Sequence, residues 1–308
     1  MEKISIVLPV YNEEGNIQVL YDKIVIELSK LPYTYEFIFV LDGCTDRSEE
    51  IVTRLMDKDP NIRLVSFTRN FGHQAALISG YNHATGDAVI TMDSDLQHPP
   101  EIIGEMVTKW KEGFSIVNTQ RKERDQKNTF KKITSRYFYQ IFSCISEVKL
   151  EEGNADFRLL DKKVVDSLNN LHESEVFLRG MIPWFGYSMT SIPYFPQERF
   201  SGSTKYSLSR MVKFGISGIS SFSIVPIRLV TYSGFFISAL TFLYIVTILY
   251  SAIILKDVVS GYTSTIVSVL FLGGIQLIAI GILGEYIGKI LIETKQRPRY
   301  VVKSRKGW

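Results

Sequence analysis

The stretch ITMDSDLQHPPE (Ile90–Glu101) ends a short apolar run with two aspartates, Asp93 and Asp95, that are separated by one residue. Two carboxylates at the end of a buried strand repel each other and lose hydration. A divalent cation removes both penalties, and Mg²⁺ commonly binds one or two carboxylates together with water and substrate phosphates. The stretch therefore predicts a Mg²⁺ or Mn²⁺ site with Asp93 and Asp95 as ligands. For His98 we favour a hydrogen-bonding role over metal binding.

Short β-rich runs alternate with helical patterns on both sides of this stretch. The expected strands are Ile4–Val10, Glu36–Leu41, Ile62–Phe67, Ala88–Met92 and Ser115–Thr119. The expected helices begin near Glu13, pass through Ile51 and Leu55, cover Gln74–Tyr81 and follow Pro100. This order predicts an α/β fold with a mostly parallel sheet. Ligands bind beyond the carboxyl ends of such strands, so we expect the polar clusters that follow four of them to line one pocket.

Two windows near the C-terminus, Leu229–Leu255 and Val258–Gly284, contain no Asp, Glu, Lys or Arg. A helix of that length reaches about 40 Å, enough to cross a hydrocarbon core of ~30 Å. We therefore predict two membrane helices, with a pair of buried core helices as the alternative. Lys and Arg precede the first window and follow the second, which by the positive-inside rule places both termini in the cytoplasm.

Other features narrow the class of protein. The N-terminus does not resemble a signal peptide, and Cys44 and Cys144 are the only cysteines, which fits a reducing compartment. We interpret the basic C-terminal segment as a membrane-surface anchor and expect no nucleic-acid partner. The helical patterns Thr129–Ile145 and Tyr206–Phe222 are candidates for interfacial helices, with a core helix as an equal alternative for the first.

Six motifs occur in a fixed order along the chain: IVLPVYNEEGNI, FVLDGCTDRS, TRNFGHQAALISG, MDSDLQHPPE, GNADFRLLDKKVVD and ERFSGSTKYSLSRM. With the two C-terminal spans, they resemble the GT-A family 2 glycosyltransferases that charge polyisoprenyl phosphates. The nearest groups are bacterial undecaprenyl-phosphate glucosyltransferases and dolichol-phosphate mannose synthases. The resemblance implies a GT-A (Rossmann-like) mixed, mostly parallel sheet followed by two transmembrane helices.

The resemblance also implies the reaction, which is inverting transfer of a single sugar from a nucleotide-diphosphate donor to undecaprenyl phosphate, with Mg²⁺ or Mn²⁺ as cofactor. UDP-glucose is our first choice of donor, and mannose, N-acetylhexosamine or a modified pentose stay open. The implied location is the bacterial inner (cytoplasmic) membrane, with a multi-pass chain and a cytoplasmic catalytic domain. Relatives form tetramers, so a homotetramer is possible.

The family's motifs assign donor residues in this sequence. Pro9, Tyr11, Glu13 and Asp42 match nucleoside-binding positions, Asp93 and Asp95 match the metal and diphosphate positions, and Gln97 lies in the same loop. Leu41 and Cys44 depart from the family's usual residues beside Asp42, which leaves the base preference open.

For the acceptor phosphate the resemblance points to five residues: Arg121, Lys132, Ser135, Arg199 and Lys205. Asp156 is the candidate general base. A phosphate monoester is already mostly anionic at neutral pH because its second pKa is near ~6. Asp156 therefore has two alternative roles, which are to orient the acceptor or a cation, and to form a structural salt bridge with Arg158.

The domain layout that we expect has four parts. Residues 1–205 form the glycosyltransferase domain, 206–228 an interfacial segment, 229–290 a two-helix membrane hairpin and 291–308 a basic cytoplasmic tail.

Three other functions are alternatives to single-sugar transfer. A processive glycan synthase usually carries a Gln-x-x-Arg-Trp segment, which is absent, and a dehydrogenase needs a G-x-G-x-x-G that does not follow the first strand. A catalytically silent sugar-nucleotide sensor is the third.

Overall fold

The computed structural model describes residues 2–122, 154–171, 173, 177–196, 227, 230–234, 236–237, 239–240, 243–244 and 261–308. The chain divides into two compact units. One comprises Met1–Met211 together with Arg297–Trp308, and the other comprises Val212–Gln296. Each unit is described by itself.

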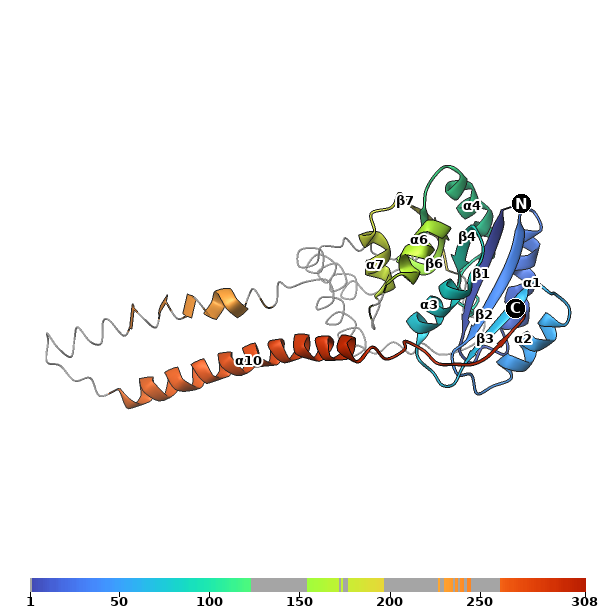
Figure 1. Ribbon diagram of the computed structural model, residues 1–308. Coiled ribbons are helices and arrows are strands. Elements are labelled where there is room, and N and C mark those ends of the chain that lie inside the picture. The colour runs from blue at the N-terminus through green and yellow to red at the C-terminus, as the bar shows by residue number, and fades with distance from the viewer. Residues whose placement is uncertain are drawn as a thin grey trace. The chain divides into compact units, whose positions relative to one another are not determined.

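The first unit contains an eight-stranded sheet, as far as the described residues show, with the order β7-β5-β6-β4-β1-β2-β3-β8. Its central strands are parallel and almost fully buried: β1 (Lys3–Val10), β2 (Thr34–Leu41), β3 (Ile62–Phe67) and β4 (Ala88–Thr91). Both faces of the sheet are covered, which is why the sequences of these strands are nearly continuous apolar runs. The parallel pairing brings four carboxyl ends to one edge, as the alternating pattern predicts (Figure 1).

Three further strands extend the sheet beyond β4. They are β5 (Ile116–Arg121), β6 (Asn154–Asp161) and β7 (Met189–Tyr194). β6 is antiparallel to both β4 and β5, whereas β7 is parallel to β5. The sheet is therefore mixed, and antiparallel β6 brings its first residues to the edge where β4 ends.

Helices cover the sheet between the strands. They are α1 (Ile17–Leu28), α2 (Ser48–Met56), α3 (His73–His83), a short 3-10 turn η1 (Pro100–Ile102), α4 (Ile103–Lys111), α6 (Lys162–Asn169) and α7 (Leu178–Trp184). α3 is buried from Ala75 to Tyr81, and a Cβ on Gly80 would lie 2.1 Å from a Val7 methyl. Glycine at this position lets α3 pack directly on β1, which sets where the first residue of α3 lies.

The C-terminal segment forms an edge strand of the first unit. β8 (Val302–Lys306) pairs antiparallel with β3, and Tyr300 stacks on Phe67 with ring centroids 4.8 Å apart. These residues therefore belong to the sheet of the first unit and do not form a separate tail, while their predicted role at the membrane surface stays a prediction. Charged side chains are common on edge strands, where they discourage pairing with other chains, and they concealed the strand in the sequence.

The second unit contains the long helix α10 (Tyr262–Lys295). Its segment Phe271–Lys295 is the one stretch, among the described residues, that is long and apolar enough to cross a membrane. Two membrane helices are therefore not confirmed, since the first apolar window lies largely outside the described residues. α10 also continues past residue 290, where we expected the hairpin to end, because Ile290, Leu291 and Ile292 extend its apolar run.

Candidate active site

The segment that follows β4 alternates between buried and half-exposed residues. Asp93, Asp95 and Gln97 are half-exposed, while Ser94, Leu96 and His98 are buried. The Ser94 hydroxyl donates to the Pro9 carbonyl at 2.8 Å, which fixes the segment against the end of β1. The alternation places the two aspartates on one open side of the chain, and their predicted binding of a metal stays a prediction.

Asp93 is held by two histidines. His73, the first residue of α3, has its Nε2 2.7 Å from Asp93 Oδ1. The Asp93 backbone N–H donates to Nδ1 of His98 at 3.2 Å, and the His98 ring stacks on Phe157. The predicted hydrogen-bonding role of His98 is thus confirmed. His73 fixes the direction of the Asp93 carboxylate, as partners of metal-binding carboxylates do.

The pKa values of this pair shift in opposite directions. Burial lowers the pKa of His73, but the hydrogen bond to Asp93 and the charges of Asp93 and Asp156 outweigh it and raise that pKa to about 9. Burial raises the pKa of Asp93, and the His73 hydrogen bond and charge reverse this and hold it below its ordinary value. Near neutral pH the pair is therefore a carboxylate and an imidazolium.

Asp42 holds the loop that leads into α3. Its carboxylate accepts hydrogen bonds from the backbone N–H groups of Phe71 at 2.6 Å and Gly72 at 2.9 Å, and the side chain is buried. Gly43 has a φ of +65°, and a Cβ there would lie 2.3 Å from the Arg69 carbonyl carbon. Glycine is required for so close an approach. In this structure Asp42 positions the loop before His73, and its predicted contact with a nucleoside stays a prediction.

The other predicted donor residues lie at the end of β1 or just after it. Tyr11 is 44% exposed, and an exposed aromatic residue at this place suits the predicted contact with a base. The Glu13 carboxylate accepts from Asn16 at 2.6 Å, and its backbone N–H donates to Ser48. Tyr11 and Glu13 follow β1 and Pro9 is its next-to-last residue, so all three lie at the same sheet edge as Asp93.

Asp156, near the start of β6, is enclosed by two arginines. Its carboxylate lies 2.9 Å from Arg158 Nη2 and 2.8 Å from Arg179 Nη2, and Arg179 Nε reaches the other carboxylate oxygen at 3.2 Å. Burial raises the pKa of Asp156, but the charges of Arg179 and Arg158 hold it well below its ordinary value. The predicted salt bridge with Arg158 is present. A carboxylate stabilised in this way is a weak base.

Arg121 at the end of β5 reaches the same cluster. Its Nη1 donates to Gln97 Oε1 at 3.3 Å, which joins a predicted acceptor residue to a predicted donor residue. The buried hydroxyl of Tyr194 completes this side, and burial raises the pKa of Tyr194 to about 12 against the opposing charge of Arg121. The other four acceptor residues, Lys132, Ser135, Arg199 and Lys205, lie outside the described residues, as do the two interfacial helix candidates.

The cluster suits a hard divalent ion. In the part of the chain that the structure describes, no three His, Cys, Asp or Glu side chains converge in the way a closed metal site needs. Two half-exposed carboxylates fit Mg²⁺ or Mn²⁺ instead, since these ions complete their shell with water and phosphate oxygens. Asp93 and Asp95 would hold such an ion.

Sequence reasoning missed two members of the cluster. His73 was noted only as part of a polar run after β3, and Arg179 was not noted. His73 is 20 residues from its partner Asp93, and Arg179 is 23 residues from Asp156. No local spacing joins these pairs, and only the polar run after β3 pointed to His73.

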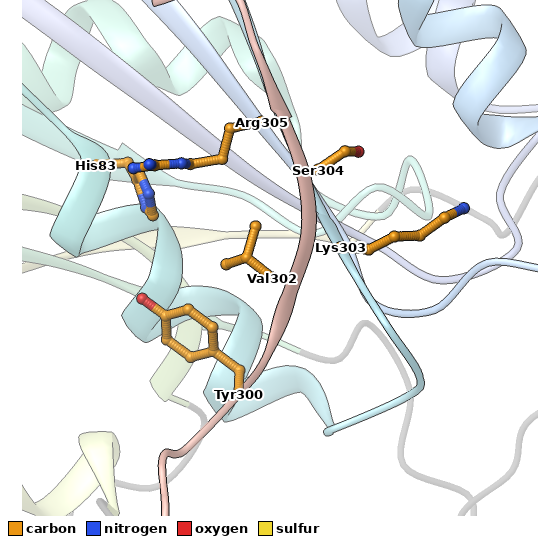
Figure 2. Close-up of a pocket in the computed structure, with 6 residues that line it drawn as sticks. All are labelled: His83, Tyr300, Val302, Lys303, Ser304 and Arg305. Carbon is orange, nitrogen blue, oxygen red and sulfur yellow. The ribbon is translucent and has the colours of Figure 1, made fainter.

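A separate cavity of about 530 Å³ lies at the far end of α3, between His83 and β8. Figure 2 shows the side chains of Tyr300, Val302 and Arg305 toward His83, with Lys303 directed away. α3 has 11 residues, so roughly 15 Å separate His83 from His73. The cavity shares no residue with the carboxylate cluster.

Comparisons with known proteins show which family the chain belongs to. The family Glycosyl transferase family 2 matches residues 5–167, and GtrB C-terminal hairpin matches residues 225–290. Bactoprenol glucosyl transferase of Shigella phage SfX is 43% identical, covering 99% of this chain and 100% of the relative. A prophage bactoprenol glucosyl transferase homolog of Escherichia coli strain K12 is 42% identical, covering 98% of each chain.

Among solved structures, glucosyl-3-phosphoglycerate synthase of Mycobacterium tuberculosis with Mn²⁺ and UDP-glucose is 17% identical, with a TM-score of 0.46, covering 71% of this chain and 77% of that chain. A likeness this distant does not bear on residues or ligands. The family match covers more than half of the chain, and relatives above 40% identity align along nearly all of it. The chain therefore belongs to glycosyltransferase family 2 and is an enzyme of that family.

Proposed function

We propose that this enzyme transfers a single glucose from UDP-glucose to a polyisoprenyl phosphate, undecaprenyl phosphate, with inversion at the anomeric carbon. The observation that carries the proposal is the link between Asp95 and Arg121 through Gln97, whose backbone N–H donates to Asp95 at 3.1 Å and whose side chain accepts from Arg121 at 3.3 Å. Carboxylates suit a metal-bound diphosphate and an arginine suits a phosphate, so donor and acceptor sites meet there. Full-length similarity to bactoprenol glucosyl transferases supports the sugar and the lipid.

The reaction is a displacement. An oxygen of the lipid phosphate attacks the anomeric carbon, a new carbon–oxygen bond forms, and the bond to the nucleoside diphosphate breaks. Mg²⁺ or Mn²⁺, when bound, would neutralise charge on the diphosphate. The residues of the chain hold the two substrates in line, which is where much of the rate enhancement arises. No general base is needed because the attacking oxygen is already anionic near neutral pH.

For the membrane part we propose a two-helix hairpin, with the catalytic domain and both termini in the cytoplasm. The match of residues 225–290 to a C-terminal hairpin family and the apolar segment Phe271–Lys295 support this arrangement. The hairpin would hold the enzyme at the leaflet that contains the lipid acceptor, and the positive-inside rule sets the orientation. Labelling of a single cysteine introduced at Lys303, whose side chain is exposed, in sealed vesicles with Cys44 and Cys144 replaced, checks the position of the C-terminus.

The test of the function is transfer from radiolabelled nucleotide sugars to undecaprenyl phosphate in detergent, with Mg²⁺, with Mn²⁺ and with a chelator. We expect one glucose per lipid from UDP-glucose and no product with the chelator. A ladder of products would contradict single-sugar transfer and favour a processive synthase. Transfer from a different donor alone would correct the sugar and keep the reaction class.

A further inference from the structure

We propose that Arg179 binds a phosphate group of a substrate, and that Asp156 is a positioning residue that aims the Arg179 guanidinium. The inference deepens the proposed function and rests on it. It assigns a phosphate ligand to a residue outside every motif that carries the family resemblance.

The first observation is the geometry of the arginine. Arg179 meets Asp156 through two N–H groups, Nε at 3.2 Å and Nη2 at 2.8 Å. A two-point contact between a planar guanidinium and a carboxylate fixes both the place and the plane of the guanidinium. The backbone N–H of Leu178 donates to the Gln74 side chain at 3.3 Å, which ties the start of α7 to the start of α3. Arg179 is therefore held through its own side chain and through the backbone of the residue that precedes it.

The second observation is the exposure of the two arginines that contact Asp156. Arg158 and Asp156 form a pair whose side chains are 3% and 6% exposed, so this arginine is shut off from solvent. Arg179, at 34% exposed, contacts the same carboxylate from the solvent side. Of the two arginines, Arg179 is therefore the one that a substrate phosphate can reach.

The third observation is the link to the metal-binding carboxylates. His73 lies 2.7 Å from Asp93 Oδ1 and 4.0 Å from Asp156 Oδ2, so one side chain spans the gap between the two acidic groups. Arg179 contacts Asp156, and His73 alone bridges from Asp156 to Asp93, where a metal-bound diphosphate is expected. Arginine is suited to phosphate at such a site because its fork matches two phosphate oxygens.

The same contacts argue against Asp156 as a general base. A carboxylate whose two oxygens are taken up by two arginines accepts a proton poorly, whereas it is well placed to hold one of those arginines. Either the diphosphate of the donor or the monophosphate of the lipid can be the anion that Arg179 binds. Both are phosphate esters, and separate binding measurements distinguish them.

The experiment uses the full-length enzyme in detergent and two probes that bind without sugar transfer, UDP with Mg²⁺ and farnesyl phosphate. Binding of each is measured by calorimetry for Arg179→Ala, Arg179→Lys and Asp156→Asn. The matched control is Arg54→Ala on α2, which removes an exposed arginine from an exposed pair with Glu50. Thermal unfolding of each variant checks that it is folded, and the lysine variant serves if the alanine variant is not.

We expect Arg179→Ala to lower the binding affinity for one of the two probes by about 10-fold or more, equivalent to ~1.4 kcal/mol. Arg179→Lys should recover only part of this, since lysine lacks the fork. Weaker UDP binding alone assigns the donor diphosphate, and weaker farnesyl phosphate binding alone assigns the acceptor. Asp156→Asn should lower the affinity for the same probe. The double variant Asp156→Asn/Arg179→Ala should bind this probe little more weakly than Arg179→Ala alone, because the two residues act together.

The proposal is overturned if both Arg179 variants bind both probes within about twofold of the parent enzyme and the control. It is also overturned if Asp156→Asn abolishes turnover while leaving both affinities unchanged, since that result makes Asp156 the base. Failure of the parent enzyme to transfer a sugar from any donor would refute the proposed function but leave these binding results interpretable.

Discussion

The end of β4 and the start of β6 lie side by side in the sheet and both carry aspartates, yet the carboxylates differ in their exposure and in their partners. At the end of β4, Asp93 is 35% exposed and is paired with a histidine that is itself 41% exposed. At the start of β6, Asp156 is buried between two arginines. A half-exposed carboxylate can take a ligand from solvent, whereas a buried one that is fully paired serves to hold its neighbours. Residue type alone therefore does not identify the reactive acid.

The largest effect should come from Asp95→Asn, which removes one charge from the proposed metal site. We expect single-sugar transfer to fall by about 10²- to 10³-fold or more, because the charge on the leaving diphosphate is then less well neutralised. Initial rates with saturating Mg²⁺ measure it. Asp57→Asn at the end of α2 removes an exposed carboxylate away from the site and is the control. Near-normal turnover of Asp95→Asn would contradict a ligand-binding role for the half-exposed carboxylates after β4.

Asp156→Asn should reduce stability more than any change at the β4 end. It removes the carboxylate charge that pairs with Arg158, whose side chain is 3% exposed. Breaking a buried ion pair by removing one partner costs about 3 kcal/mol or more. Thermal unfolding of the variant in detergent measures the loss, and Asp93→Asn, whose carboxylate is half-exposed, is the matched comparison. Equal losses for the two variants would contradict a structural role that is specific to Asp156.

How much of this was predictable depends on where the determining contacts lie. Strand β3 (Ile62–Phe67) has the predicted bounds because its own apolar residues define it. β8 could not be predicted, because VKSRK is polar and forms a strand only where β3 offers it an edge. Asp93 and Asp95 were found because they share one strand end. Arg179 was not, because its place depends on how α7 packs near β6, and sequence spacing carries no record of that.

The His73–Asp93 pair gives a test by pH. The folded pKa of His73 is raised to about 9, so its contribution to stability is fully present below the unfolded value of ~6.5 and is lost as pH rises through about 9. With metal removed by chelator, His73→Gln should lower the unfolding temperature more at pH 6.5 than at pH 10. Asp93 and Asp156 favour the charged histidine, and Arg179 opposes it. Because the side chains are half-exposed, the difference should be about 1 kcal/mol or less.

A difference between parent and variant that does not change from pH 6.5 to pH 10 would contradict a charged His73. Such a result would also weaken the contrast between the two acids, since Asp93 would then lack a cationic partner. His83→Gln is the matched control. Its ring nitrogen bonds to the Ser79 carbonyl at the other end of α3, and no carboxylate is among its described partners.

The smallest effect should come from Gln97→Ala, which sharpens the boundary between donor and acceptor groups. Gln97 accepts from Arg121 at 3.3 Å, a long hydrogen bond between exposed side chains, so its loss should cost ~0.5–1 kcal/mol. We expect kcat/KM to fall roughly two- to fivefold, through the acceptor KM, because Arg121 then loses a contact that fixes its direction. Gln18→Ala removes an exposed glutamine contact on α1 and is the control. A loss as large as that of Asp95→Asn would instead support the direct donor contact that the family resemblance implies for Gln97, and the half-exposed side of the β4 segment would then contain three functional groups instead of two.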